Sequence, residues 1–275
     1  MKKVLFCTDF SETSKLAFTY LLNFMDDREL SIDLAHIFDI PITMSSSQFP
    51  RAVEGLITER GDALRQQLTS WRDQIPNKQT GELHIIYGVY PSTEIVELAT
   101  RINADLIVMG LRQKYSMVDR LIGTVTANTI SKSTIPVLAI PQGATYQPIR
   151  NIIFPTIMGI DDQLSQAEED ALFKLIEFAN FSGGTKVNFV HIQTDSEDQQ
   201  ARIDIIFNDV PFKGIEYTRS YAPRVDEGVL KFLEDGKADL LAFYKPHRSF
   251  WERLYHSSLT RKLLFKSRIP LLIFH

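Results

Sequence analysis

An internal repeat is the strongest constraint that this sequence places on its fold. The stretch that begins at Asp105 recurs at Asp239, and the stretch that begins at Ile135 recurs at Ile269, in both cases after 134 residues (239 − 105 and 269 − 135). Two separate matches at one spacing indicate a duplicated domain rather than chance similarity. The proline-flanked stretch 141–148 has the composition of a linker, which predicts domains at residues 1–142 and 149–275.

Each copy alternates short apolar runs with amphipathic stretches. In the first copy this pattern predicts strands at 2–7, 31–38, 83–87, 105–109 and 136–140, with helices at 12–25, 50–74, 92–102 and 118–132. In the second copy it predicts strands at 150–154, 186–192, 215–219, 239–243 and 270–274. Strands separated by helices favour an α/β fold with two tandem, doubly wound, five-stranded parallel sheets.

The carboxyl ends of such strands are where ligands bind, which directs attention to the first copy. Asp9 follows the first strand, and its carboxylate suits the hydroxyl groups of a nucleoside, although Asp9 and Ser11 also suit the start of a helix. Gly110 ends the fourth strand, where the missing Cβ leaves room for a ligand. Gly123 and Thr124 open the next helix, either to offer amides to a phosphate or simply to start that helix.

With these motifs in place, the chain resembles the universal stress protein family. The resemblance is carried by the first strand and turn (4–12), the fourth strand (104–110) and the fifth strand (135–138), and it extends more loosely to the second copy. It implies a UspA-like, Rossmann-like fold of the adenine nucleotide alpha hydrolase type. It also implies a stress-associated regulatory or binding protein. Because members of the family pair through their final strands, the resemblance implies that the two copies pack together as an internal pseudo-dimer, with the strands at 136–140 and 270–274 near each other. A homodimer of two chains is a separate expectation.

ATP-binding members of this family have a glycine, two residues, a second glycine, nine residues, and then glycine with serine or threonine. Gly110, Gly123 and Thr124 stand at these places, whereas Gln113 replaces the second glycine. The resemblance further assigns Asp9 and Ile37 to nucleoside contacts. The nucleotide-binding set is therefore Asp9, Ile37, Gly110, Gln113, Gly123 and Thr124, with ATP as the ligand and the role of magnesium open.

The second copy departs further from the pattern. Ile157 stands in the place of Asp9, Tyr244 in that of Gly110, and Ser257 and Ser258 in those of Gly123 and Thr124, which predicts no ATP site of this kind. Residues 245–268 carry seven basic side chains and one acidic one. They fit either a solvated helix or a site for a different anion.

Charge and composition exclude several other classes. Each half carries a net charge of about −2 (14 basic and 16 acidic residues before Tyr146, 16 and 18 after it), which disfavours nucleic acid as a partner. No apolar run approaches the length of a membrane span, and the single cysteine, Cys7, favours a cytoplasmic protein. Without metal-ligand spacing or a nucleophile beside a base, we assign no metal site and no catalytic residue.

Three functions are therefore open. The first is a regulator that holds ATP in its first domain with little or no hydrolysis. The second is a nucleotide-free protein-interaction scaffold of the same fold. The third is an enzyme with a related nucleotide fold, which the missing phosphate-loop motif disfavours.

Overall fold

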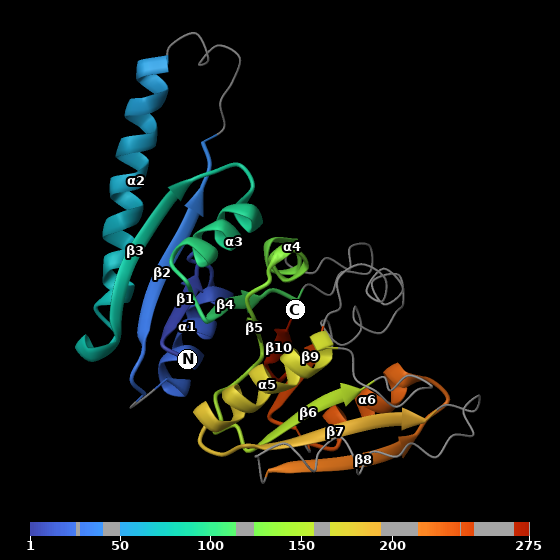
Figure 1. The fold of residues 1–275 in the computed structure, drawn as a ribbon. Helices are drawn as coiled ribbons and strands as arrows, with labels where there is room; N and C mark the ends of the chain where they lie inside the picture. Colours follow the sequence, from blue (N-terminus) through green and yellow to red (C-terminus); the bar gives the residue numbers. More distant parts are fainter. Residues whose placement is uncertain are drawn as a thin grey trace. The chain divides into compact units, whose positions relative to one another are not determined.

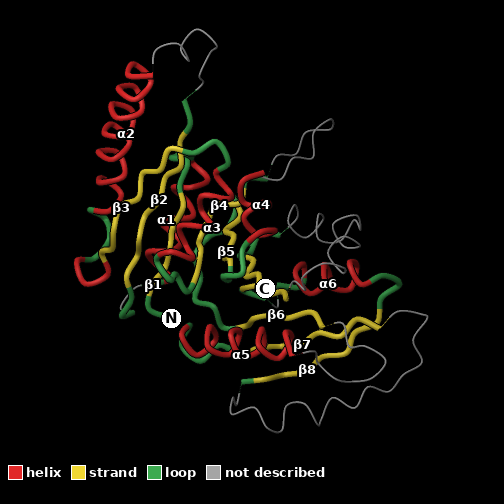
Figure 2. Tube along the Cα trace, turned by 45° about the horizontal axis from the view of Figure 1, so that its top comes forward, coloured by secondary structure: helices red, strands yellow, loops and turns green. Residues whose placement is uncertain are grey.

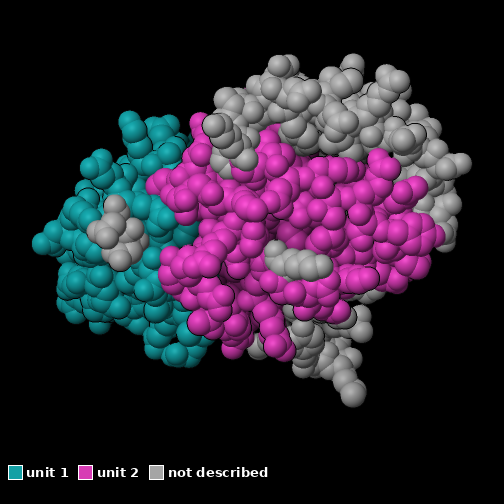
Figure 3. Space-filling model, turned by 90° about the horizontal axis from the view of Figure 1, so that it is seen from below, with its two compact units in different colours: residues 1–111, 123–137 teal, residues 112–122, 138–275 magenta. Residues whose placement is uncertain are grey.

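The structure is a computed structural model that describes residues 1–25, 28–40, 50–113, 124–156, 166–193, 214–236, 238–244 and 267–274. Strands and helices alternate along most of the described chain (Figure 2), except that the strand Asn151–Thr156 follows the strand Val137–Pro141 directly, and the chain forms two compact units (Figure 3). Unit 1 comprises residues 1–111 and 123–137, and unit 2 comprises residues 112–122 and 138–275. The α/β fold with a mostly parallel sheet confirms the predicted fold class, while the domain boundary expected at 142–149 stays a prediction.

Unit 1 is built on four strands in the order β3-β2-β1-β4. The strands are β1 (Lys3–Cys7), β2 (Ser31–Phe38), β3 (Thr80–Tyr87) and β4 (Leu106–Leu111). The pairs β1–β2, β1–β4 and β2–β3 are all parallel. All four strands lie within three residues of their predicted starts and two of their predicted ends, because short apolar runs bounded by turn residues mark buried parallel strands clearly.

The helices of unit 1 are α1 (Glu12–Phe24), α2 (Pro50–Arg72), α3 (Pro91–Arg101) and α4 (Thr124–Lys132), with a short 3-10 helix at Asn77–Gln79. Helices α1 and α2 share one face of the sheet, since Phe18 and Trp71 both pack against Phe6 of β1, with ring centroids 5.2 and 6.2 Å away. The first turns of α2 extend past the ends of the strands (Figure 1). Leu56 of this helix is half exposed.

Unit 2 contains β5 (Val137–Pro141), whose first residue is the last of unit 1, followed by β6 (Asn151–Thr156), β7 (Lys186–Gln193), β8 (Ile215–Tyr221), β9 (Leu240–Tyr244) and β10 (Leu271–Phe274). Their order is β5-β10-β9-β6-β7-β8. The described helices are α5 (Gln166–Phe181) and α6 (Val225–Glu234). The predicted proximity of the strands at 136–140 and 270–274 is confirmed, because β5 and β10 are neighbours in this sheet.

The repeat seen in the sequence is also a repeat of the hydrogen bonds that connect two strands of each copy. The Asp105 carboxylate accepts the amides of Lys2 and Lys3, and the Asp239 carboxylate accepts those of Arg150 and Asn151. Val4 lies opposite Leu106, just as Ile152 lies opposite Leu240. Each aspartate therefore ties the start of its copy's first strand to the start of the fourth, which explains why this residue recurs.

Candidate functional site

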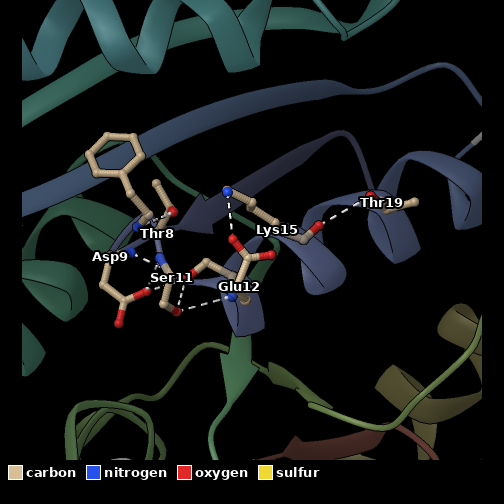
Figure 4. A network of polar contacts seen from close by, with 8 residues as sticks. Thr8, Asp9, Ser11, Glu12, Lys15 and Thr19 are labelled. Carbon is tan, nitrogen blue, oxygen red and sulfur yellow. Dashed lines mark hydrogen bonds and ion pairs between the residues drawn. The ribbon is translucent and has the colours of Figure 1, made fainter.

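The candidate site is built around the turn between β1 and α1 (Figure 4). The Asp9 Oδ1 atom accepts a hydrogen bond from the Ser11 amide at 3.0 Å and one from the Ser14 hydroxyl. Ser11 is the N-cap of α1, with its side chain accepting from the Ser14 amide at 3.3 Å. The expectation that Asp9 and Ser11 start the helix is thus confirmed, yet Asp9 remains solvent-exposed. Ser14 is a further site residue that the sequence reasoning missed, because its hydroxyl lies one turn into the helix.

Phe10, the next residue in this turn, has a left-handed backbone with φ of 58°. A bulky residue pays for this conformation in steric strain, so its surroundings must compensate. The Phe10 amide donates to the Thr8 hydroxyl at 2.9 Å, and its ring lies 4.5 Å from the His36 ring and 5.7 Å from that of Trp71. These contacts fix the turn that presents Asp9.

His36 secures the same turn from β2. Its Nδ1 atom lies 2.7 Å from the Thr8 carbonyl oxygen. Burial lowers the pKa of His36, and the charge of Arg60 acts in the same direction, against the opposing effects of the Thr8 hydrogen bond and the Asp9 charge. A neutral His36 donating through Nδ1 fits this environment. His36 therefore has a structural role, which is to hold the turn between β1 and α1.

The register of the strands places the predicted residues at one edge of the sheet. Cys7 lies opposite both Ala35 of β2 and Met109 of β4. Asp9 and Ile37 each lie two residues beyond this line, and Gly110 lies one residue beyond it. Parallel strands have their carboxyl ends at one edge, so three of the six predicted residues come together there.

Gly110 has a packing role that the sequence did not reveal. A Cβ atom at this position would lie 3.0 Å from the Thr13 carbonyl oxygen, so the missing side chain lets α1 approach β4 closely. The Gly110 carbonyl accepts a hydrogen bond from the Thr126 hydroxyl at 2.9 Å. This bond brings the first turn of α4 to the end of β4. Thr126 is thus another residue of the site that sequence reasoning missed.

The remaining predicted residues have different outcomes. Thr124 is the first residue of α4, as the spacing predicts, whereas Gly123 lies outside the described residues. Gln113 is half-buried, and its Nε2 atom donates to the Ser267 carbonyl at 3.0 Å. The glutamine side chain is therefore engaged with the turn before β10.

In the second copy, the described part of the site differs from the first. Tyr244 is the last residue of β9 and lies opposite Phe274 of β10. A tyrosine in the place of Gly110 brings a large side chain to a position that in the first copy has no room for a Cβ. Ile157, Ser257, Ser258 and most of the basic segment, residues 245–266, lie outside the described residues.

Other chemistries find little support in the part of the chain that the structure describes. None of its residues form a group of three histidine, cysteine, aspartate or glutamate side chains suited to a metal ion. Within the same residues, we find no helix with the length and apolar character that a bilayer crossing requires. Cys7 is buried, and burial raises the pKa of its thiol far above the usual value, which makes it a poor nucleophile.

These features define the class of the protein. It has a Rossmann-like α/β domain, with polar groups and the starts of helices at the carboxyl edge of the sheet, and a second copy of this domain follows in the chain. The chain belongs to the universal stress protein family, whose family model matches residues 1–141. The fold and the family resemblance inferred from the sequence are thereby confirmed.

Individual relatives agree with this assignment. The chain is 28% identical over 154 residues to a universal stress protein of Methanocaldococcus jannaschii, which covers 50% of this chain and 94% of the relative. It is 27% identical over 161 residues to the stress response protein NhaX of Bacillus subtilis, covering 50% and 96%. These relatives therefore correspond to one copy of the repeat.

A solved structure matches the whole chain. The universal stress protein from Archaeoglobus fulgidus superposes with a TM-score of 0.72 at 17% identity, covering 99% of this chain and 97% of that one. At this identity the likeness concerns the fold alone. It extends the family's fold to the second copy, which the family model does not reach.

Proposed function

We propose that this protein is a stress-associated regulator that binds one adenine nucleotide, ATP, in its first copy, with little or no hydrolysis. The observation that carries the proposal is the strand register, which gathers Asp9, Ile37 and Gly110 at one edge of the sheet. The start of α4 joins them through the bond from Thr126 to Gly110. In this proposal the protein is a cytoplasmic homodimer with neither nucleic acid nor membrane as a partner.

Each part of this edge suits one part of a nucleotide. The Asp9 carboxylate is exposed and fixed by its turn, so it can accept hydrogen bonds from ribose hydroxyls without further ordering. Ile37 is half-buried and offers an apolar contact to the base. The amides in the first turn of α4, which begins at a threonine, suit the phosphates, since a helix N-terminus attracts anions.

The same edge is poorly equipped for hydrolysis. Phosphoryl transfer needs a group that orients water and positive charge on the transferred phosphate. Among the described residues of this edge, the Asp9 carboxylate is engaged by its turn and the His36 ring lies against the Thr8 carbonyl, so both are used to hold the turn. The proposal therefore assigns no catalytic residue.

A nucleotide-free interaction scaffold is the second candidate. The observation that favours it is the bond from Gln113 to Ser267, which places a tethered side chain where ATP-binding relatives have a glycine. The close packing of Gly110 on α1 also accounts for that glycine without a ligand. Nucleotide binding itself separates the two candidates.

A calorimetric titration of the full chain with magnesium ATP tests the proposal, after a check for nucleotide carried through purification. We expect saturation near one site per chain. The variant Asp9→Asn keeps an oxygen for Ser11 and Ser14 but loses the charge, so we expect affinity to fall by about tenfold or more, as for loss of a charged hydrogen-bond acceptor. Asp73→Asn, an exposed position after α2, is the matched control with the same change in net charge.

Two results would reject the proposal. The first is an absence of heat and of competition in the wild-type protein, which favours the scaffold. The second is equal affinity in the wild type and Asp9→Asn, which places any nucleotide elsewhere. Turnover of ATP at enzymatic rates would reject the part that concerns hydrolysis.

A further inference from the structure

Gln113 makes a contact that its place in the sequence does not suggest. Its side-chain amide donates to the backbone carbonyl of Ser267, 154 residues later, at 3.0 Å. Both residues belong to unit 2. A glutamine two residues beyond the end of β4 is thereby tied to the turn that leads into β10.

The acceptor is held in a fixed turn. Ser267 is 2% exposed, and its hydroxyl donates to the Ile269 carbonyl at 2.7 Å and accepts from the Ile269 amide at 3.3 Å. The first copy has the same turn, in which Ser133 makes both bonds to Ile135, at 2.7 and 3.0 Å. The turn therefore belongs to the repeated fold and presents a stationary carbonyl to Gln113.

The chain between β4 and Gln113 is held at both ends. Leu111, the last residue of β4, is fully buried. Gln113 forms an isolated backbone bridge in addition to its side-chain bond. A phosphate that approaches the backbone of residues 111–113 has to compete with these contacts, because a peptide group engaged in a bridge is not directed at a ligand.

We propose that Gln113 is a latch whose bond to Ser267 opens when a nucleotide binds, so that occupancy of the first copy is transmitted to β10 of the second. This inference rests on the proposed function. If binding breaks the bond, the bond weakens nucleotide affinity, and by thermodynamic linkage the nucleotide loosens the Ser267 turn to the same extent. Gln113 is a positioning residue here and touches no reacting group.

The size of the effect follows from the chemistry of the bond. A neutral amide-to-carbonyl hydrogen bond typically shifts an equilibrium by about fivefold. Removing it in Gln113→Ala should therefore raise the affinity for magnesium ATP by about fivefold. Alanine is preferable to glycine as the test, because glycine would also add backbone freedom.

The control is another glutamine with the same bond elsewhere. Gln74, beyond the end of α2, donates through Nε2 to the Ser70 carbonyl, also at 3.0 Å. Gln74→Ala removes an equivalent contact and should leave nucleotide affinity unchanged. Hydrogen exchange gives a second readout, with peptides over 267–274 as the reporter and peptides over 186–193 as the internal reference, because β7 is not a neighbour of β10 in the sheet.

We expect three results from the exchange measurement on the full chain. Without nucleotide, Gln113→Ala exchanges about fivefold faster than the wild type at 267–274 and equally at 186–193. Magnesium ATP accelerates exchange at 267–274 in the wild type. In Gln113→Ala it causes no further acceleration, because the latch is already open.

The latch is overturned if the wild type binds magnesium ATP and Gln113→Ala binds it with equal affinity, or if bound nucleotide leaves exchange at 267–274 unchanged. If no protein binds magnesium ATP, the proposed function fails and the nucleotide-linked latch fails with it. These failures are distinguishable, since exchange in the nucleotide-free proteins reports separately whether Gln113 holds the Ser267 turn.

Discussion

Gly110 is a residue of the candidate site that is also needed for the packing of α1 on β4. A Cβ here would lie 3.0–3.1 Å from three atoms of Thr13, two of them backbone, so Gly110→Ala has to push α1 away from β4. We expect a loss of about 1–3 kcal/mol in the free energy of unfolding, typical of overpacking, measured by urea denaturation. Gly143→Ala, where a Cβ meets nothing within 4 Å, is the control. Equal stability of the two variants would contradict the packing role of Gly110.

The reactivity of Cys7 tests whether the end of β1 is buried. Burial raises the pKa of its thiol well above the usual value, so almost no thiolate forms at pH 8. We expect a disulfide reagent such as DTNB to leave the native protein unmodified over minutes and to react at once in denaturant. Rapid modification of the native protein would show that the end of β1 is open to solvent, against the burial found here.

At the scale of elements, the pair of strands β2 and β3 contains a buried carboxylate. Asp33 of β2 is 1% exposed and lies 3.0 Å from the Nε2 atom of His84 on β3, while its other oxygen accepts from the Glu82 amide at 3.2 Å. Between Ile32 and Leu34 the register shifts, and a Cβ on Gly81 would meet Asp33 at 2.2 Å. The irregularity in β3 is thus shaped around this carboxylate.

The Asp33 environment makes stability depend on acid pH. Burial acts to raise the pKa of Asp33, but the hydrogen bonds from His84 and Glu82 and the charges of Lys3 and His84 outweigh it and lower the pKa below the ordinary 3.8. The ionised form then stabilises the fold above about pH 4, and this contribution is lost as the pH falls through the folded pKa. We therefore expect acid to destabilise the wild type more than a variant that lacks the carboxylate.

The second copy suggests that variant. Asn188 lies opposite Ile153, just as Asp33 lies opposite Leu5, so Asn occupies the equivalent position. Asp33→Asn should lose about 1–3 kcal/mol of stability at pH 7, where it gives up the negative charge that accepts hydrogen bonds from His84 and the Glu82 amide. As the pH falls from 5 to about 2, the Asp33→Asn variant should lose less of its free energy of unfolding than the wild type loses. Urea titrations at several pH values measure both, and parallel pH profiles would contradict the assignment.

Most elements could be predicted from the sequence, whereas several contacts of the site could not. The strand at 31–38 was predicted to the residue, because its apolar pattern is bounded by clear turns. The bond from Thr126 to Gly110 and the left-handed Phe10 depend on how elements pack, which no local pattern encodes. Asp9 was predicted both as a helix start and as a ligand group. The structure shows its helix contacts, and its ligand role stays a prediction.

At the scale of the whole molecule, the repeat explains which contacts could be predicted from the sequence and which could not. A hydrogen bond that both copies make needs the same residue type in both. Asp105 and Asp239, and likewise Ser133 and Ser267, therefore mark the two copies in the sequence. A contact made once leaves no such trace. The bond from Gln113 to Ser267 joins residues 154 positions apart, and only the folded chain reveals it.

The neighbouring strands β5 and β10 lead to a prediction about the first copy alone. All residues of β5 are buried, and its neighbour β10 comes from the last residues of the chain. A fragment of residues 1–142 lacks β10 and therefore presents an apolar edge strand, which pairs readily with another chain. We expect the fragment to self-associate in sedimentation experiments. The full chain, measured at the same concentrations, is the reference. A folded, monomeric fragment would show that β5 does not need its neighbour. It would also make any dimer of the full chain independent of this edge.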